Sequence, residues 1–302
     1  NEEEVIAICH DRIRTVFKKM TYQLEIVFIN DGSRDKTASL IMDLCGKYKD
    51  VIFIDLSRNF GKEAAMSAGI EAATGNAVII LDADLQDPPE LIPQFVKKWE
   101  EGFDNIYGKR LEREGESWIK KKTASMFYTA IKSMSHVDIP QNVGDFRLLS
   151  RQAVNALVEL PERHRFMKGL FAWVGFNTIQ IEYKRHSRAA GETKWNYWQL
   201  WNFALEGITS FTTLPLRVAS YLGGLISIAS LIYAIFIIIR TILNGTQVDG
   251  YASQMVVILF LGGLQLASLG IIGEYIGRIY GETKNRPLYL VKQVINLPKT
   301  TD

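Results

Sequence analysis

The acidic segment Asp82-Ala83-Asp84-Leu85-Gln86-Asp87-Pro88-Pro89-Glu90 directly follows the apolar run at residues 77–81. The run is typical of a buried β-strand, and the paired prolines favour the start of a helix, where a missing N–H costs least. An acidic segment between a strand and a helix lies at the carboxyl end of the strand. Ligands bind at this edge in α/β sheets, so the segment indicates both a fold class and a candidate site.

The residues around this segment repeat the same alternation of strand and helix. Residues 25–29 and 51–54 are two further apolar runs, and helical patterns cover residues 35–49 and 62–73. Such repeats predict a parallel sheet with helices on its faces. The first run ends in Asn30-Asp31-Gly32-Ser33, which places a second polar cluster at the same edge.

Side chains alternate along an extended segment, so Asp82, Asp84 and Gln86 can project to one side. Two carboxylates and an amide oxygen are hard ligands that suit a divalent ion holding substrate phosphates. A lone Asp-x-Asp also occurs in ordinary turns, which is the simpler interpretation. Basic residues should balance the remaining phosphate charge, although each alone is more typical of a solvated surface charge; the candidates are Lys62, Arg110, Arg188 and Lys194.

Composition and motifs exclude several classes of protein. The 35 Lys and Arg residues and 33 Asp and Glu residues among 302 give a net charge of +2, too balanced for a nucleic-acid binder. Neither a G-x-G-x-x-G fingerprint nor a Walker A motif occurs. Two cysteines, Cys9 and Cys45, are too few for a disulfide framework or a Cys-rich zinc site and favour a reducing compartment.

The C-terminal third predicts a membrane hairpin. Residues 218–239 and 251–273 contain no charged residue or histidine, and each is long enough for the roughly 30 Å hydrocarbon core. A pair of buried core helices is the alternative. Arg217 precedes the first span and four basic residues follow the second, whereas the connecting segment offers only Arg240, so both chain ends should be cytoplasmic.

An aromatic stretch precedes the first span: Trp195, Tyr197, Trp198, Trp201, Phe203 and Phe211. Their spacing predicts a helix lying in the membrane interface, with an ordinary amphipathic core helix as the alternative. Small residues in the spans permit close helix contact and assembly into a homo-oligomer.

Six motifs, spread over nearly the whole chain, resemble those of family 2 glycosyltransferases of the polyprenyl-phosphate class. This class includes dolichol-phosphate mannose synthases and bacterial bactoprenol glucosyltransferases. The matching stretches are Asn30-Asp31-Gly32-Ser33 with Asp35 and Thr37, Ser57-Arg58-Asn59-Phe60-Gly61-Lys62, the segment 82–90, Gly144-Asp145-Phe146-Arg147-Leu148, Gly191-Glu192-Thr193-Lys194-Trp195, and Gly273-Glu274-Tyr275-Ile276-Gly277-Arg278.

The resemblance implies an α/β catalytic domain of the GT-A type, Rossmann-like with a mainly parallel sheet. We therefore expect a catalytic domain at residues 1–193, interfacial helices at 194–216, two transmembrane helices within 217–274, and a cytoplasmic tail at 275–302. The implied reaction is metal-dependent, with Mg²⁺ or Mn²⁺, and transfers one sugar with inversion from a nucleotide sugar to a lipid phosphate at the inner or plasma membrane.

The resemblance also implies roles for individual residues. Glu2 and Asp31 would contact the nucleoside, Asp84 and Gln86 would hold the metal, and Asp82 would lie close to the ribose or the metal. Lys62 would neutralise the leaving diphosphate, and Asp145 would be the acidic catalytic residue at the acceptor side, its alternative being a turn residue after Gly144. The lipid phosphate would be bound by Arg188 and Lys194, with Arg110 as a weaker candidate.

One departure from the family pattern concerns the start of the chain. Family members usually begin with a strand leading into Pro-x-Tyr-Asn-Glu, whereas this sequence starts at Asn1-Glu2. We therefore expect the sequence to be a piece of a longer protein, which bears on the Glu2 assignment.

The whole-chain pattern favours undecaprenyl phosphate as acceptor and UDP-glucose as donor, while GDP-mannose and a UDP-aminosugar such as UDP-4-deoxy-4-formamidoarabinose stay open. A processive polysaccharide synthase is disfavoured, because no Gln-x-x-Arg-Trp signature occurs and two spans are too few for a channel. A membrane-anchored protein that binds nucleotide sugars without catalysis is the remaining alternative.

Overall fold

The computed structural model describes residues 1–111, 143–163, 165–183, 214–244 and 250–298. The chain divides into two compact units. The α/β unit comprises Asn1–Gly207 and Arg286–Asp302, and the hairpin unit comprises Ile208–Asn285.

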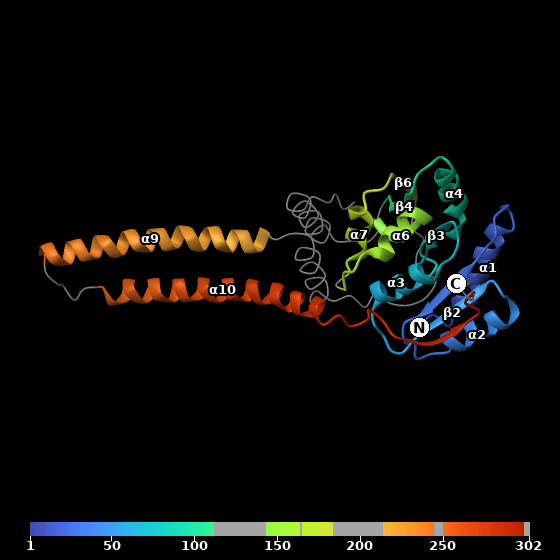
Figure 1. Ribbon diagram of the computed structural model, residues 1–302, viewed down its shortest axis with the longest axis horizontal. Coiled ribbons are helices and arrows are strands. Elements are labelled where there is room, and N and C mark those ends of the chain that lie inside the picture. Colours follow the sequence, from blue (N-terminus) through green and yellow to red (C-terminus); the bar gives the residue numbers. More distant parts are fainter. Residues whose placement is uncertain (112–142, 164, 184–213, 245–249, 299–302) are drawn as a thin grey trace. The chain divides into compact units, whose positions relative to one another are not determined.

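The first sheet of the α/β unit has the strand order β1-β2-β7, from Ile26–Asn30, Val51–Leu56 and Val291–Ile295. Strands β1 and β2 are parallel, and β7 is antiparallel to β2. The helices of this region are α1 (Ile6–Phe17), α2 (Thr37–Lys47) and α3 (Lys62–Ala72) (Figure 1). Every residue of β2 is buried, because alternate side chains pack on opposite faces: Phe53 lies against Ile41 of α2, and Ile54 lies against Ala68 of α3.

The second sheet has the order β3-β5-β4-β6, from Ala77–Ile80, Val143–Ser150, Asn105–Arg110 and Thr178–Tyr183. The predicted helix after the prolines begins as a 3-10 turn, η1 (Pro89–Leu91), and continues as α4 (Ile92–Glu100). Phe95 of α4 packs into a core with Ile106 and Leu148. Two further helices, α6 (Arg151–Glu159) and α7 (Met167–Trp173), complete the described part of this half.

The α/β expectation is confirmed, but the prediction of a mainly parallel sheet is wrong for the described strands. Two of their pairings are parallel, β1 with β2 and β4 with β6, whereas β2–β7, β3–β5 and β4–β5 are antiparallel. The strand–helix repeat that predicted parallel pairing covers only consecutive strands. Strands β5 and β7 come from later parts of the chain and enter in the opposite direction.

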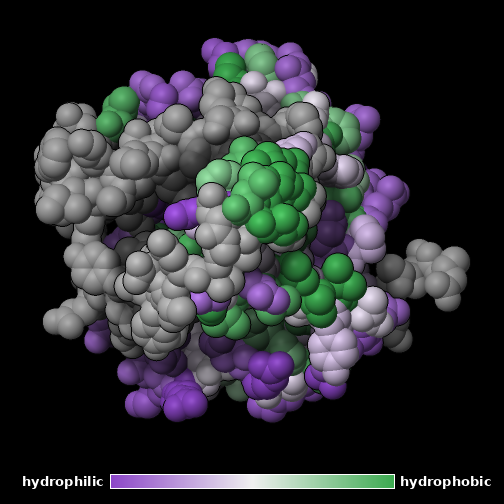
Figure 2. Space-filling view, turned by 90° about the vertical axis from the view of Figure 1, so that its left-hand side faces the viewer, coloured by the Kyte–Doolittle hydropathy of each residue, from purple (hydrophilic) through white to green (hydrophobic). Residues whose placement is uncertain are grey.

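The hairpin unit consists of α9 (Leu214–Asn244) and α10 (Tyr251–Thr283), which extend beyond the predicted spans at 218–239 and 251–273. Apolar side chains are exposed on both helices, among them Leu225 and Leu266. Figure 2 shows hydrophobic residues gathered on the face turned to the viewer. Within the described residues, Phe260–Thr283 is long and apolar enough to cross a membrane.

The predicted cytoplasmic tail at residues 275–302 is not one segment in the structure. Its first residues continue α10 to Thr283, and the chain then rejoins the α/β unit at Arg286 and forms β7. The predicted interfacial helix at 194–216 lies outside the described residues, apart from residues 214–216, which begin α9.

Candidate active site

Three charged side chains from separate elements meet in what we call the Lys62 cluster: Lys62, Asp82 and Asp145. The ammonium Nζ of Lys62 lies 2.8 Å from Oδ2 of Asp82 and 2.7 Å from Oδ2 of Asp145. Lys62 opens α3, after Gly61 with a φ of +98°. The cluster is reachable from solvent, since the side chains of Lys62 and Asp82 are 52% and 31% exposed.

Strand pairing explains why the two aspartates meet. Strands β3 and β5 are antiparallel, with Ala77 opposite Ser150 and Ile80 opposite Arg147. The same register, continued two residues past the end of β3, places Asp82 opposite Asp145. Asp145 therefore lies in a strand, and the alternative of a turn residue after Gly144 is wrong.

The cluster fixes the charge of its members. Burial alone would raise the pKa of Asp145, but Lys62, Lys168 and Arg147 outweigh it and lower this pKa below its ordinary value. Asp82 keeps a raised pKa, since burial and repulsion from Asp145 and Asp84 exceed the attraction of Lys62. Near neutral pH, Asp145 is accordingly an ionised carboxylate held by a protonated lysine.

Asp84 and Gln86 lie in the turn that follows Asp82. The backbone N–H of Gln86 donates to Oδ1 of Asp84 at 3.1 Å, and the turn contains Leu85, which is buried and has a φ of +57°. No group of three or more His, Cys, Asp or Glu side chains arranged for a metal occurs in the described residues. The predicted set of Asp82, Asp84 and Gln86 nonetheless has the donor chemistry that Mg²⁺ or Mn²⁺ prefers, because it offers two carboxylates and an amide oxygen, and the charge of Asp84 contributes to the raised pKa of Asp82.

Asp31 joins this region to the end of β1. Its two carboxylate oxygens accept the backbone N–H groups of Phe60 and Gly61 at 2.7 and 2.9 Å. The contact requires close approach of two loops: Gly32 has a φ of +71°, and a Cβ there would lie 2.6 Å from the backbone nitrogen of Asn59. Asp31 therefore holds the loop 57–61, which leads directly into Lys62.

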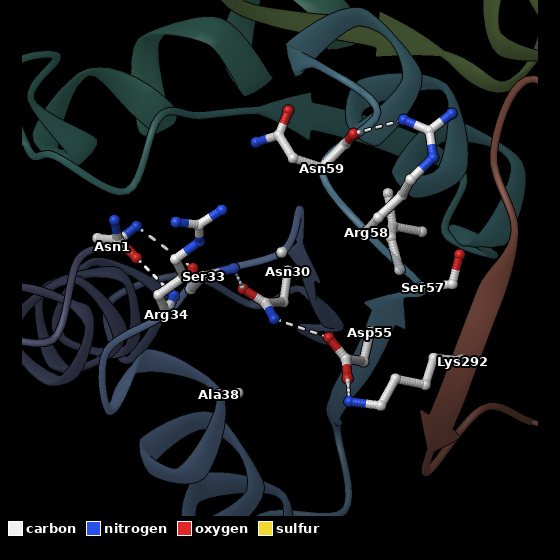
Figure 3. A pocket seen from close by; sticks show the side chains of 12 residues that line it. Asn1, Asn30, Ser33, Arg34, Ala38, Asp55, Ser57, Arg58, Asn59 and Lys292 are labelled. Carbon is white, nitrogen blue, oxygen red and sulfur yellow. Dashed lines mark hydrogen bonds and ion pairs between the residues drawn. The ribbon is translucent and has the colours of Figure 1, made fainter.

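A polar pocket of about 630 Å³ opens beside this loop, at the carboxyl ends of β1 and β2 (Figure 3). Its lining includes Arg34, Arg58 and Lys292, with Asp55 as its carboxylate, so cations predominate. The predicted nucleoside ligands Glu2 and Asp31 are not among its lining residues. Asn1 lines the pocket, whereas the backbone N–H of Glu2 donates to Oγ1 of Thr37.

The predicted phosphate ligands are placed in part. Arg110 is buried and forms an ion pair with Asp87 at 3.2 Å, and its Nε donates to the hydroxyl of Tyr183 at 3.2 Å. The Tyr183 hydroxyl in turn donates to Asp87. These contacts assign Arg110 to a buried network. Arg188 and Lys194 lie outside the described residues.

Comparison with known proteins adds independent evidence. Residues 1–158 match the family Glycosyl transferase family 2, and residues 214–279 match the GtrB C-terminal hairpin. The chain belongs to glycosyl transferase family 2. The family expected from the sequence is thus confirmed, the chain is a glycosyltransferase, and its apolar hairpin associates it with a membrane.

Relatives are similar over almost the full length. An uncharacterised glycosyltransferase of Synechocystis sp. is 55% identical over 98% of this chain and 93% of its own. The bactoprenol glucosyl transferase of Shigella phage SfX is 50% identical over 97% of this chain and 96% of its own. A mannosyltransferase from Pyrobaculum calidifontis, solved in complex with GDP-Man and Mn²⁺, covers 90% of this chain and 83% of its own at 14% identity, with a TM-score of 0.45.

The surroundings of the Lys62 cluster also contain charged residues that the sequence did not single out. Burial and the nearby Asp145 raise the pKa of Glu63 to about 7, and its Oε2 is buried without a hydrogen-bond partner among the described residues. Burial lowers the pKa of Lys168, which Asp145 partly offsets. Arg147 is buried with its guanidinium 3.7 Å from the ring centre of Phe171. Glu63 directly follows one matching motif and Arg147 lies inside another, whereas no pattern marked Lys168.

Proposed function

We propose that this glycosyltransferase transfers a single glucose from UDP-glucose to undecaprenyl phosphate, with inversion, at the cytoplasmic face of the membrane. The Lys62 cluster carries the proposal, because it gathers two carboxylates and an ammonium at the sheet edge where β3 ends and the antiparallel β5 begins, next to a cationic pocket. Relatives named for bactoprenol glucosyl transfer support the sugar and the acceptor, since they are about 50% identical over nearly the whole chain.

The donor side of the reaction uses the cationic pocket and the metal set. Arg34 and Arg58, which line the pocket, would bind the nucleoside diphosphate. The nucleoside roles of Glu2 and Asp31 rest on the resemblance to the family, since neither residue lines the pocket. Asp82, Asp84 and Gln86 would hold Mg²⁺ or Mn²⁺, which supplies Lewis-acid stabilisation of the leaving diphosphate when bound. Lys62 adds a permanent positive charge on the same side, since its partners raise its pKa.

The acceptor side needs little proton transfer. A phosphate monoester has a second pKa of about 6, so the attacking oxygen is already largely ionised near neutral pH. Asp145 is ionised as well and has a lowered pKa, which makes it a weak base. Its role is to orient the acceptor and to take a proton from the minority protonated form, while Arg188 and Lys194 hold the lipid phosphate.

The path of the chain supports the membrane topology. The α/β unit includes chain from both before and after the hairpin, since β7, which follows α10, pairs with β2. A segment that leaves one side of a bilayer and returns to the same side crosses it an even number of times. Together with the basic residues that flank the spans, this path supports a cytoplasmic location for the catalytic residues and for both described ends of the chain.

Transfer of radiolabelled sugar to undecaprenyl phosphate tests the proposal. The full chain in detergent is given UDP-glucose, GDP-mannose or a UDP-aminosugar, with Mg²⁺, Mn²⁺ or EDTA. We expect chloroform-extractable label from UDP-glucose that EDTA abolishes. Labelled lipid formed from another donor would show that the proposed sugar is wrong. Nucleotide binding without transfer from any donor would favour the non-catalytic alternative.

Asp145→Asn tests the acceptor role. We expect turnover to fall about 10- to 100-fold, because the variant removes a positioned carboxylate but leaves the ionised acceptor. The turnover of Lys62→Met is measured beside that of Asp145→Asn, since this variant removes the ammonium that pairs with both Asp82 and Asp145. Near-native turnover of Asp145→Asn from pH 6 to 8 would remove Asp145 from the reaction.

A further inference from the structure

The strand that follows the membrane hairpin is built firmly into the α/β unit. Strand β7 pairs with β2, with Phe53 opposite Ile295 and Ile54 opposite Val294. Beyond the strand, the side-chain amide of Asn296 donates to the backbone oxygens of Cys45 and Val51 at 2.9 and 3.0 Å. The strand pairing and the Asn296 hydrogen bonds therefore fix the position of the backbone of β7.

Lys292 is a bulge residue within this strand. Gln293 lies opposite Asp55, and Val291 lies opposite Leu56, so two steps along β7 match one step along β2. Lys292 is the residue left between the two pairs. A β-bulge turns a side chain away from the regular alternation, and bulges occur preferentially at sheet edges and beside active sites.

The bulge brings the Lys292 ammonium to the carboxylate of the cationic pocket. Its Nζ lies 3.1 Å from Oδ2 of Asp55, whose side chain is only 9% exposed, and both residues line the pocket (Figure 3). A buried carboxylate is costly without a compensating charge, so Asp55 depends on this partner. The side chain of Lys292 is itself 65% exposed.

Asp55 in turn contacts Asn30, the last residue of β1, which holds the loop that follows this strand. Its Oδ1 accepts a hydrogen bond from the side-chain amide of Asn30 at 2.7 Å, and Oδ1 of Asn30 accepts the backbone N–H of Ser33 at 3.2 Å. The same loop contains Asp31, which holds the backbone of Phe60 and Gly61 ahead of Lys62. Side-chain contacts thus connect β7 to the loop that shapes the donor side.

We propose that Lys292 is a positioning residue for the nucleotide: through Asp55 and Asn30 it sets the loop 31–33, so the segment after the hairpin determines affinity for the nucleoside diphosphate. The inference rests on the proposed function, because it assigns the cationic pocket to the nucleotide donor. An ordinary surface ion pair is the competing explanation, and it predicts no effect on nucleotide binding.

The test uses the full chain in detergent and compares Lys292→Met with the wild type, with Lys292→Arg and with the neighbouring Gln293→Met. The readouts are the UDP dissociation constant by calorimetry, KM and kcat for the donor, and the melting temperature. For Lys292→Met we expect the dissociation constant and KM to rise about tenfold, with kcat within about twofold of the wild type. Lys292→Arg should restore most of the affinity, and Gln293→Met should match the wild type.

Three other results would count against the inference. Unchanged UDP affinity in Lys292→Met would overturn it, and so would an equal loss of affinity in Gln293→Met. A lowered melting temperature with proportionate loss of kcat would assign Lys292 to stability instead. If the wild type itself neither binds UDP nor transfers sugar from a UDP donor, the proposed function fails, and that result is separable from any difference between variants.

Discussion

Two halves of the segment 82–90 place the same residue type in opposite surroundings. The side chain of Asp82 is 31% exposed, and that of its partner Lys62 is 52% exposed. Lys62 also pairs with Asp145, so the three charges come from separate elements. Asp87 is 1% exposed and is fully engaged by Arg110 and Tyr183. Solvent therefore reaches the first arrangement, whereas the charges of the second are paired and closed off from it.

The two halves are nonetheless coupled through one glycine. The guanidinium of Arg110 lies so close to Gly144 that a Cβ there would be 2.6 Å from its Nη2. Gly144 directly precedes Asp145 in β5. The buried Asp87–Arg110 pair therefore supports the strand that presents Asp145 to the Lys62 cluster.

The largest expected effect belongs to the exposed half. Asp84→Asn removes a predicted metal ligand, so we expect transfer to fall by about 10²- to 10³-fold, which corresponds to roughly 3–4 kcal/mol of transition-state stabilisation. The measurement is kcat/KM for the donor at saturating Mn²⁺. The melting temperature should be unchanged, and activity within twofold of the wild type would remove Asp84 from the metal site.

The buried half should respond in stability instead. Asp87→Asn leaves the Arg110 guanidinium buried without its countercharge, and we expect a loss of about 3 kcal/mol in the free energy of unfolding. Chemical denaturation of the full chain in detergent measures this loss. The double variant Asp87→Leu with Arg110→Leu should recover much of it; lost activity at unchanged stability would place Asp87 in the site.

Glu63 lies between these extremes and should make stability depend on pH. Burial and Asp145 raise its pKa from 4.5 to about 7, so the native state retains a proton that the unfolded chain has released. Its contribution to stability is complete below pH 4.5 and disappears as pH rises through 7. Glu63→Gln lacks this loss, and its advantage over the wild type should grow by about 2 kcal/mol between pH 5 and 8.

Unfolding at pH 5, 6.5 and 8 measures that difference, with Glu162→Gln as a matched control because Glu162 also has a buried carboxylate oxygen without a hydrogen-bond partner among the described residues. A difference between Glu63→Gln and the wild type that stays constant with pH would show that Glu63 titrates normally.

The smallest effect belongs to the last residue of the segment. Glu90 forms an ion pair with Arg12 at 2.6 Å, but the two side chains are 55% and 34% exposed. Such surface pairs contribute little, so Glu90→Gln should cost at most about 0.5 kcal/mol and leave transfer unchanged. A double-mutant cycle with Arg12→Gln measures the coupling; a value above about 1.5 kcal/mol would show that exposure does not separate the roles within this segment.

The sequence predicted the parts of the fold that local pattern determines. Strand β2 was expected from its apolar run, because burial on both faces leaves a clear signal, and the two helices of the hairpin were expected from the length of their apolar runs. Strands β5 and β7 were not expected. Each contains charged residues, such as Arg147 and Lys292, whose placement depends on partners distant in sequence.

The site shows the same limit. The Asp82 and Asp145 motifs were found separately, but their meeting depends on the β3–β5 register, which no local pattern encodes. Arg110 was expected at a phosphate, since nothing near it in sequence revealed its pairing with Asp87, 23 residues away. The residue types predicted which kind of chemistry a site could support, whereas tertiary contacts determine which of these residues lie together in one site.

The late position of β7 also has a consequence for the order of events during synthesis. The ribosome synthesises β2 long before β7. At a synthesis rate of roughly 5–20 residues per second, the edge of β2 that pairs with β7 stays unpaired for on the order of ten seconds or more. Both hairpin helices are made within that interval. The last side of the cationic pocket is therefore added only after both hairpin helices exist, so under the proposed function a nascent chain would complete its donor site only once its membrane segment has been made.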